Sequence, residues 1–175
     1  MGQPSGLNDD SVSYVTARPA ATSDPWTAQG DRASQRLLEV GETDAPAEVS
    51  EALDCQGRLV VRRRVMLFDG VPVELTDSYY PLSVASGTAL AEKRKVRGGT
   101  PTLLAELGYV AHEVAEDVSA RPATAVEAAS LDLRDGNSVL VLLRTTRAAD
   151  GSPFEVSRMV MRPEGRHLRY RWVVG

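Results

Sequence analysis

The fold is decided by residues 59–80, which read LVVRRRVMLFDGVPVELTDSYY. Two runs rich in apolar and aromatic residues, Leu59 to Leu67 and Val71 to Tyr80, flank the dipeptide Asp69-Gly70. Asp-Gly between such runs is a strong signal for a two-residue hairpin turn, because both turn residues need a positive φ. The stretch therefore predicts two antiparallel strands joined by a tight turn.

A two-residue loop also sets the register of the hairpin. It predicts three pairs across the strands: Phe68 with Val71, Arg64 with Leu75, and Arg62 with Asp77. A longer loop would shift these pairs. Since side chains alternate along a strand, Arg62 and Arg64 share one face, and Arg63 points to the other.

The segments around this hairpin supply further strands and three short helices. The other strands are expected at Ser34 to Val40, Tyr109 to Val118, Val139 to Thr146, Phe154 to Met161 and Leu168 to Val173. The turn Asp150-Gly151 joins the strands Val139 to Thr146 and Phe154 to Met161 into a second hairpin. Helices are expected at Pro46 to Leu53, from an N-cap at Thr100 to a C-terminal Gly108, and at Pro122 to Leu131. Strands joined by hairpins outnumber helices, which predicts an α+β domain with a mostly antiparallel sheet flanked by helices.

Composition sets the outline of the chain. Of its 175 residues, 42% are hydrophobic and 25% charged, as in ordinary globular proteins, which excludes a collagen-like, coiled-coil or fully disordered chain. Residues 1–33 are rich in Ser, Pro, Gly, Asp and Ala and are expected to form a tail, with the folded domain at 34–175. The net charge is −4, and neither half has the basic excess of a nucleic-acid-binding surface.

Several classes of site are disfavoured by the residue types. The longest apolar runs, such as residues 139–143, are too short to span a membrane, and no secretory signal opens the chain, so we expect a cytoplasmic location. Cys55 is the only cysteine, which excludes an internal disulfide. His112 and His167 lack metal-ligand spacing, and we expect neither a metal nor a cofactor.

Two features suggest an anion site. Arg62 and Arg64 share a face of a largely apolar strand, and a guanidinium matches a carboxylate or phosphate. The helix start at Thr100, after two glycines, offers free backbone N–H groups. The alternatives are cross-strand ion pairing, for instance of Arg62 with Asp77, and plain helix capping.

The order of several motifs resembles the UTRA domain, the effector-binding half of the HutC subfamily of bacterial GntR transcriptional regulators. The matching segments are residues 62–74, Ser78-Tyr79-Tyr80-Pro81, residues 102–109, residues 142–146 and residues 150–157. The resemblance runs from about Ser34 to Tyr170. It implies the chorismate lyase fold and a homodimer.

The same resemblance suggests what the N-terminal tail is. Residues 13–19, Ser-Tyr-Val-Thr-Ala-Arg-Pro, resemble the end of the winged helix-turn-helix that precedes UTRA in these regulators. Residues 1–33 would then be a remnant of the wing plus the interdomain linker. DNA would be bound only through a winged helix-turn-helix, which this chain does not contain. The chain would then be a truncated regulator or a standalone effector domain.

The resemblance also assigns site residues. In members that sense sugar phosphates, arginine on the first hairpin and a hydroxyl residue at the next helix start hold the phosphate, and these positions are Arg64 and Thr100 here. Glu155 matches a glutamate that contacts a ligand hydroxyl or amine. A second arginine and an aromatic residue of such members are replaced by Met66 and Met161, which argues against a sugar phosphate and allows a less polar ligand, a carboxylate among them. Arg62 is expected to supply the missing charge.

The sequence thus predicts a non-enzymatic domain in which a small anionic metabolite modulates operator binding by the intact dimer. The predicted ligand-binding residues are Arg62, Arg64, Thr100 and Glu155. One alternative is an enzyme related to chorismate lyase that acts on a small carboxylated substrate. Another is a dimerisation module with a vestigial pocket.

Overall fold

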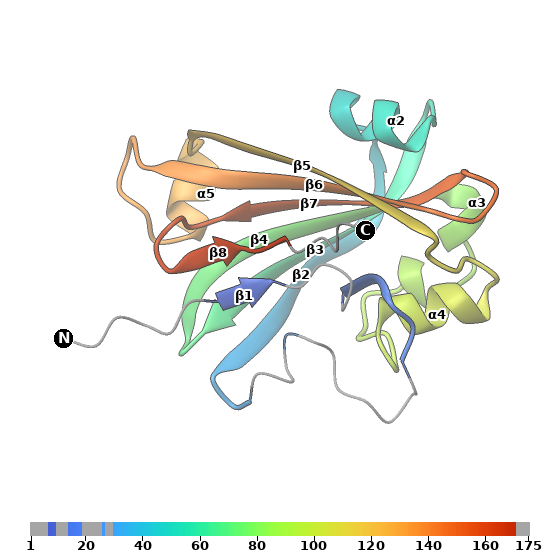
Figure 1. Cartoon of the computed structure of the whole chain (residues 1–175), viewed down its shortest axis with the longest axis horizontal. Coiled ribbons are helices and arrows are strands. Elements are labelled where there is room, and N and C mark those ends of the chain that lie inside the picture. The colour runs from blue at the N-terminus through green and yellow to red at the C-terminus, as the bar shows by residue number, and fades with distance from the viewer. Residues whose placement is uncertain (1–6, 10–13, 19–25, 27–29, 171–175) are drawn as a thin grey trace, which may run out of the picture.

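A six-stranded antiparallel sheet forms the body of the protein (Figure 1). The computed structural model describes residues 7–9, 14–18, 26 and 30–170. The strands lie in the order β2-β3-β4-β7-β6-β5. Their bounds are Ala33–Asp44 for β2, Arg58–Phe68 for β3, Val71–Pro81 for β4, Glu113–Pro122 for β5, Ser138–Arg147 for β6 and Pro153–Met161 for β7. The α+β prediction is confirmed.

Short helices cover the two faces of this sheet. Their bounds are Ala47–Leu53 for α2, Leu82–Ala85 for α3, Ala89–Ala91 for the 3₁₀ turn η2, Thr100–Glu106 for α4 and Ala125–Ser130 for α5. On one face, Val49 and Leu53 of α2 pack against Leu59, Val61 and Tyr79. On the other, α3, η2 and α4 pack around Val60 and Tyr80. Figure 1 shows α2 and α4 on opposite sides of the strands.

The first hairpin has the predicted turn but not the predicted register. Asp69 and Gly70 have φ values of 50° and 77°, and Phe68 pairs with Val71 as expected. A bulge then intervenes, since Leu67 pairs with Pro72 and Met66 with Glu74, which leaves Val73 unpaired with β3.

The predicted pairs beyond this bulge are wrong by one residue. Arg64 lies opposite Thr76, and Arg62 lies opposite Ser78. Pro72 has no N–H for the ladder. The carbonyl of the neighbouring Val73 accepts a hydrogen bond from the Arg162 N–H at 3.1 Å instead. A one-residue slip turns a strand over, so the even-numbered residues of β4 share the face of Arg64.

The second hairpin, β6 and β7, forms where it was predicted, whereas β5 begins four residues later than expected. The residues before β5 terminate α4 instead. Gly108 has a φ of 93°, and the Tyr109 N–H donates to the Leu104 carbonyl at 2.8 Å, which closes the end of that helix.

Two predicted helix starts are also corrected. Gly99, with a φ of 86°, is the N-cap of α4, and Thr100 is its first helical residue. Pro122 ends β5, and α5 is opened by Thr124, whose side chain forms a capping box with Glu127. In both cases the proline indicated that a helix was near but not the residue at which it began.

Two short strands, one near each end of the described chain, form a second sheet. β1 (Leu7–Asp9) pairs in parallel with β8 (Arg166–Leu168). The expected closing strand therefore begins earlier than predicted, and its residues 171–175 lie outside the described part of the chain. None of the helices in the described ranges has the length and apolar character that crossing a membrane requires.

Candidate functional site

A pocket lies on the sheet face that also carries α4. It is open to solvent at its mouth. Its floor comes from β3, β4, β6 and β7, one wall from the start of α4, and another from residues 14–16, Arg18 and Trp26. Of the four predicted ligand-binding residues, three line this pocket: Arg64, Thr100 and Glu155.

The floor is organised in rows that run across the strands. One row contains Ser78, Ser157 and Arg144, which are direct neighbours on β4, β7 and β6. The next contains Arg64, Thr76, Met159 and Leu142. A third contains Met66, Glu74 and Met161. The floor is thus polar at one end and rich in methionine at the other.

Arg64 is the arginine of the first hairpin that faces the pocket. Its Nη2 donates to the Ser78 Oγ at 2.8 Å, and that hydroxyl lies 2.8 Å from the Ser157 Oγ. Its Nε is buried and has no hydrogen-bond partner, and among the described residues Arg64 forms no ion pair. A guanidinium in this state has donor capacity left for an anion.

Glu155 lies at the polar end of the pocket, where its carboxylate interacts electrostatically with Arg64. Its Oε1 accepts a hydrogen bond from the Tyr80 hydroxyl at 2.8 Å and a longer one from Ser157 at 3.5 Å. Loss of solvent around the carboxylate raises the pKa of Glu155, while the Tyr80 bond and the charges of Arg64 and Arg144 oppose part of that rise. Burial, together with the Glu155 charge, also raises the pKa of Tyr80.

Arg144 is a pocket residue that the sequence reading missed. Its Nε donates to Glu116 at 2.6 Å, and the side chains of this pair are only 8% and 7% exposed. Its guanidinium carbon also lies 5.8 Å from the centre of the Tyr14 ring. Its position in the motif of residues 142–146 could have identified it, because side-chain alternation along that strand puts Leu142 and Arg144 on one face.

Arg62 is not among the residues that line the pocket, although it shares the face of Arg64. It is 4% exposed and donates to four backbone carbonyls. These belong to Ala89 at 3.2 Å, Leu90 and Glu92 at 2.9 Å each, and Arg94 at 2.8 Å. Burial lowers the pKa of Arg62. The expectation that Arg62 replaces a missing ligand contact is therefore corrected: its donors hold the loop that follows α3.

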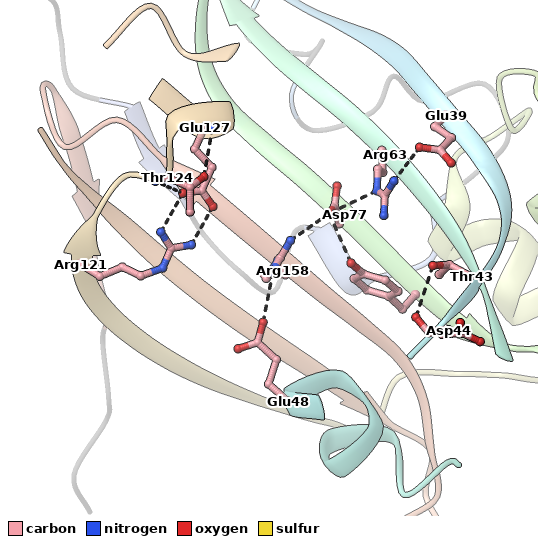
Figure 2. Close-up of polar contacts among 11 residues, drawn as sticks. Glu39, Thr43, Asp44, Glu48, Arg63, Asp77, Arg121, Thr124, Glu127 and Arg158 are labelled. Carbon is pink, nitrogen blue, oxygen red and sulfur yellow. Dashed lines mark hydrogen bonds and ion pairs between the residues drawn. The ribbon is translucent and has the colours of Figure 1, made fainter. Parts of the chain in front are cut away.

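Arg63 lies on the opposite face, as predicted, in a chain of ion pairs (Figure 2). It bridges Glu39 at 2.6 Å and Asp77 at 3.6 Å. Asp77 continues to Arg158 at 3.2 Å, and Arg158 to Glu48 of α2 at 3.3 Å. The acid expected to pair with Arg62 thus pairs with Arg63 and Arg158, because the bulge places Asp77 on their face.

The wall above the floor joins α4 to the N-terminal residues. Thr100 lines the pocket together with Gly98 and Gly99. Thr102 accepts a hydrogen bond from the Arg18 N–H at 3.2 Å and donates one to the Arg18 carbonyl at 3.0 Å. Figure 1 shows the dark blue segment of residues 14–18 beside α4. The composition of residues 1–33 gave no hint that Arg18 and the 1% exposed Trp26 help to enclose a pocket.

Within the described residues, no group of three or more His, Cys, Asp or Glu side chains is arranged to hold a metal ion. The side chains that line the pocket offer a ligand charge, hydrogen bonds and apolar contact.

Comparison with known proteins finds one domain family and transcriptional regulators among the relatives. The UTRA domain matches residues 28–165. An uncharacterised HTH-type transcriptional regulator of Streptomyces coelicolor, SCO4628, is 30% identical over 151 residues, which cover 83% of this chain and 54% of that protein. The chain spans about half the length of the curated relatives it matches.

Solved structures show the same fold. The crystal structure of a GntR-family transcriptional regulator aligns with a TM-score of 0.80 at 24% identity, over 99% of this chain and 72% of that one. The ligand-binding domain of a GntR-family regulator from Bordetella bronchiseptica aligns with a TM-score of 0.66 at 26% identity, over 83% and 91% of the two chains. The match over residues 28–165 covers most of the sequence, and the chain belongs to the UTRA domain family.

Proposed function

We propose that this chain is the effector-sensing domain of a cytoplasmic bacterial regulator of the GntR/HutC type. A small anionic metabolite would bind in the pocket and change the operator affinity of the full-length homodimer. UTRA membership and the transcriptional regulators among its relatives support this proposal. The division of the chain into a linker at residues 1–33 and an effector domain at 34–175 is part of the same proposal.

The observation that carries it is the state of Arg64. The side chain borders a pocket, its Nε has no hydrogen-bond partner, and among the described residues it forms no ion pair. A buried donor without an acceptor costs free energy, and a charged one costs more. An anion that accepts from Arg64, with Thr100 on the wall and Glu155 on the floor, would remove that cost.

The pocket is also lined by residues of the N-terminal segment, which would connect this domain to the DNA-binding domain of a full-length regulator. Tyr14 and Arg18, which line the pocket, precede the effector domain in the chain, and Arg18 is hydrogen-bonded to Thr102 of α4. A ligand in contact with both would favour one arrangement of the segment that leads to the DNA-binding domain. Such coupling requires that the two arrangements differ in ligand affinity.

The comparisons lend no support to the alternative of a chorismate lyase-like enzyme, since the relatives are transcriptional regulators. Incubation with chorismate and assay for 4-hydroxybenzoate and pyruvate tests it directly. Formation of either product at a catalytic rate would replace the proposed function.

The proposal is tested by a thermal-shift screen of the chain against sugar phosphates, amino acids and aromatic and aliphatic carboxylates. A ligand at a hundredfold excess over its Kd should stabilise the native state by about 2.7 kcal/mol. Arg64→Ala should weaken binding by about 1.5–3 kcal/mol, roughly 10- to 150-fold.

Arg63→Ala is the matched control, because Arg63 neighbours Arg64 in sequence but lies on the opposite face among exposed ion pairs. It should bind as the unaltered chain does. Equal affinity in the Arg64→Ala variant, or no shift with any anion of the panel, would contradict the proposal.

A further inference from the structure

The pocket floor changes character within two rows. Arg64 and Met66 are two residues apart on β3, which separates them by about 7 Å. The row of Arg64 and the row beyond it carry four apolar side chains that line the pocket and are each less than 9% exposed: Met159 and Leu142, then Met66 and Met161. A ligand anchored at Arg64 that extends along the strands therefore lies over thioethers and a leucine.

Three polar side chains at this end already have partners within the protein: Glu74, Thr76 and Trp26. Glu74 accepts a hydrogen bond from Thr76 at 2.6 Å and forms an ion pair with Arg166, whose side chain is 1% exposed. The indole Nε1 of Trp26 donates to the Ser34 carbonyl at 2.9 Å. A ligand with many hydroxyl groups would find these partners already bonded, and it would lose its own hydration without compensation.

The arginines around the floor differ in whether an ion pair neutralises them. Arg144 is neutralised by Glu116, and Arg166 by Glu74. Arg64 is the floor arginine with neither an ion pair nor a filled Nε among the described contacts. A phosphate monoester carries about two charges at neutral pH and needs more donors than this end offers.

Resting on the proposed function, we propose that the ligand is an amphipathic monocarboxylate. Its carboxylate accepts from Arg64, and its apolar body, an acyl chain or an aromatic group, lies over Met66, Met159 and Met161. The flexible thioethers adapt to the shape of this body. The methionine end of the pocket is thus the part that selects the ligand.

The test is calorimetric titration of the chain with hexanoate, octanoate and decanoate below their micellar concentrations, beside octanol and glucose 6-phosphate. Each buried methylene should tighten binding about fourfold, so octanoate should bind roughly 15-fold more tightly than hexanoate. Octanol, which lacks the charge, should bind at least tenfold more weakly than octanoate. Glucose 6-phosphate should bind more weakly than octanoate.

A pair of variants separates a ligand contact from a folding defect. Met159→Gln keeps the length of the side chain but adds a polar end, and it should weaken octanoate binding about tenfold or more. Met159→Leu keeps the apolar surface and should stay within threefold of the unaltered chain. Thermal melts of both variants without ligand check that the fold is retained.

Two kinds of failure are distinct. An affinity that does not depend on chain length, or glucose 6-phosphate binding more tightly than octanoate in an Arg64-dependent way, would overturn this inference and leave the proposed function standing. Binding of carboxylates that is unchanged in Arg64→Ala would overturn both.

Discussion

Three consecutive arginines have three different environments. Arg63 points to the face with α2 and joins exposed ion pairs, Arg62 is buried beneath a loop, and Arg64 opens onto the pocket. Alternation along the strand separates Arg63 from the other two. About 7 Å along the strand then separates Arg62 from Arg64, enough to bring one under the carbonyls after α3 and leave the other uncovered. The role of each arginine follows from its neighbours and not from its residue type.

Glu155 should make the stability of the ligand-free domain depend on pH. Its pKa is raised in the native state from the ordinary value of 4.5, so the ionised carboxylate destabilises the native state at neutral pH. That penalty should fade as the pH falls through the raised native pKa toward 4.5. Glu155→Gln keeps an oxygen for the Tyr80 hydroxyl but cannot ionise, and its Tm should exceed that of the unaltered chain at pH 8.

Thermal melts between pH 8 and pH 5 measure this effect. The Tm difference between Glu155→Gln and the unaltered chain should narrow steadily as the pH falls. A glutamine variant that is less stable at pH 8, or a difference that widens toward pH 5, would contradict the prediction.

At the level of elements, the pocket depends on one irregularity in the first hairpin. The bulge at Val73 turns β4 over, so that Glu74 and Thr76 lie on the pocket floor and Asp77 lies on the opposite face. Without it, the register predicted from the turn would place Asp77 opposite Arg62, on the same face as Arg64. A single unpaired residue thus decides whether a carboxylate or a threonine lies on the floor near Arg64.

The loop after α3 depends on β3 in a similar way, through Arg62. Arg62→Met preserves the apolar stem but removes the donors to four carbonyls, between residues 89 and 94. Partly buried carbonyls left without donors should cost about 2–4 kcal/mol of unfolding free energy. Urea denaturation should show a lower midpoint at an unchanged m-value.

Arg63→Ala again serves as the comparison, since its ion pairs are partly exposed and should contribute at most about 1 kcal/mol. If Arg62→Met unfolds at the same urea concentration as the unaltered chain, Arg62 does not hold the loop.

Across the whole molecule, the two faces of the sheet differ in kind. The face with α2 and α5 is closed by apolar clusters and by the ion-pair chain of Figure 2. The other face is packed around Val60 and Tyr80 at one end, and beyond them it carries the pocket, which Tyr14, Arg18 and Trp26 help to enclose. The pocket is thus built from the sheet, the start of α4 and the N-terminal residues.

Occupancy of the pocket should therefore be detectable in the N-terminal segment. The Arg18 N–H donates to Thr102, and a bound ligand that contacts this wall should slow hydrogen exchange of that amide about tenfold or more. Exchange measured by nuclear magnetic resonance, with a saturating carboxylate found in the screen, tests this. Thr102→Val removes the acceptor and should abolish the protection.

The amide of Cys55, which donates to the Ser50 carbonyl beside α2 on the opposite face, provides the internal control. Equal protection of Cys55 and Arg18 would mean general stabilisation without a specific effect on the segment. No protection of Arg18 at saturation would separate the segment from the pocket.

Much of the fold could be read from local patterns. Alternating apolar residues and Asp-Gly turns specify both hairpins, because strand periodicity and turn geometry depend on neighbours in sequence. The motifs also led to the family and to Arg64, Thr100 and Glu155 as pocket residues, although their contact with a ligand stays a prediction. The helix boundaries were less accurate, since Gly99 and Thr124 cap helices that prolines only signalled.

The features that could not be predicted from the sequence are those that depend on contacts between residues far apart in the chain. The bulge at Val73 involves Arg162, the burial of Arg62 involves carbonyls about thirty positions away, and the pocket wall joins Arg18 to Thr102. Such contacts have no local signature, because they form only when separate elements pack. Local chemistry therefore determined the strands, the turns and the family, whereas packing decided which arginine holds a loop and which one opens onto the pocket.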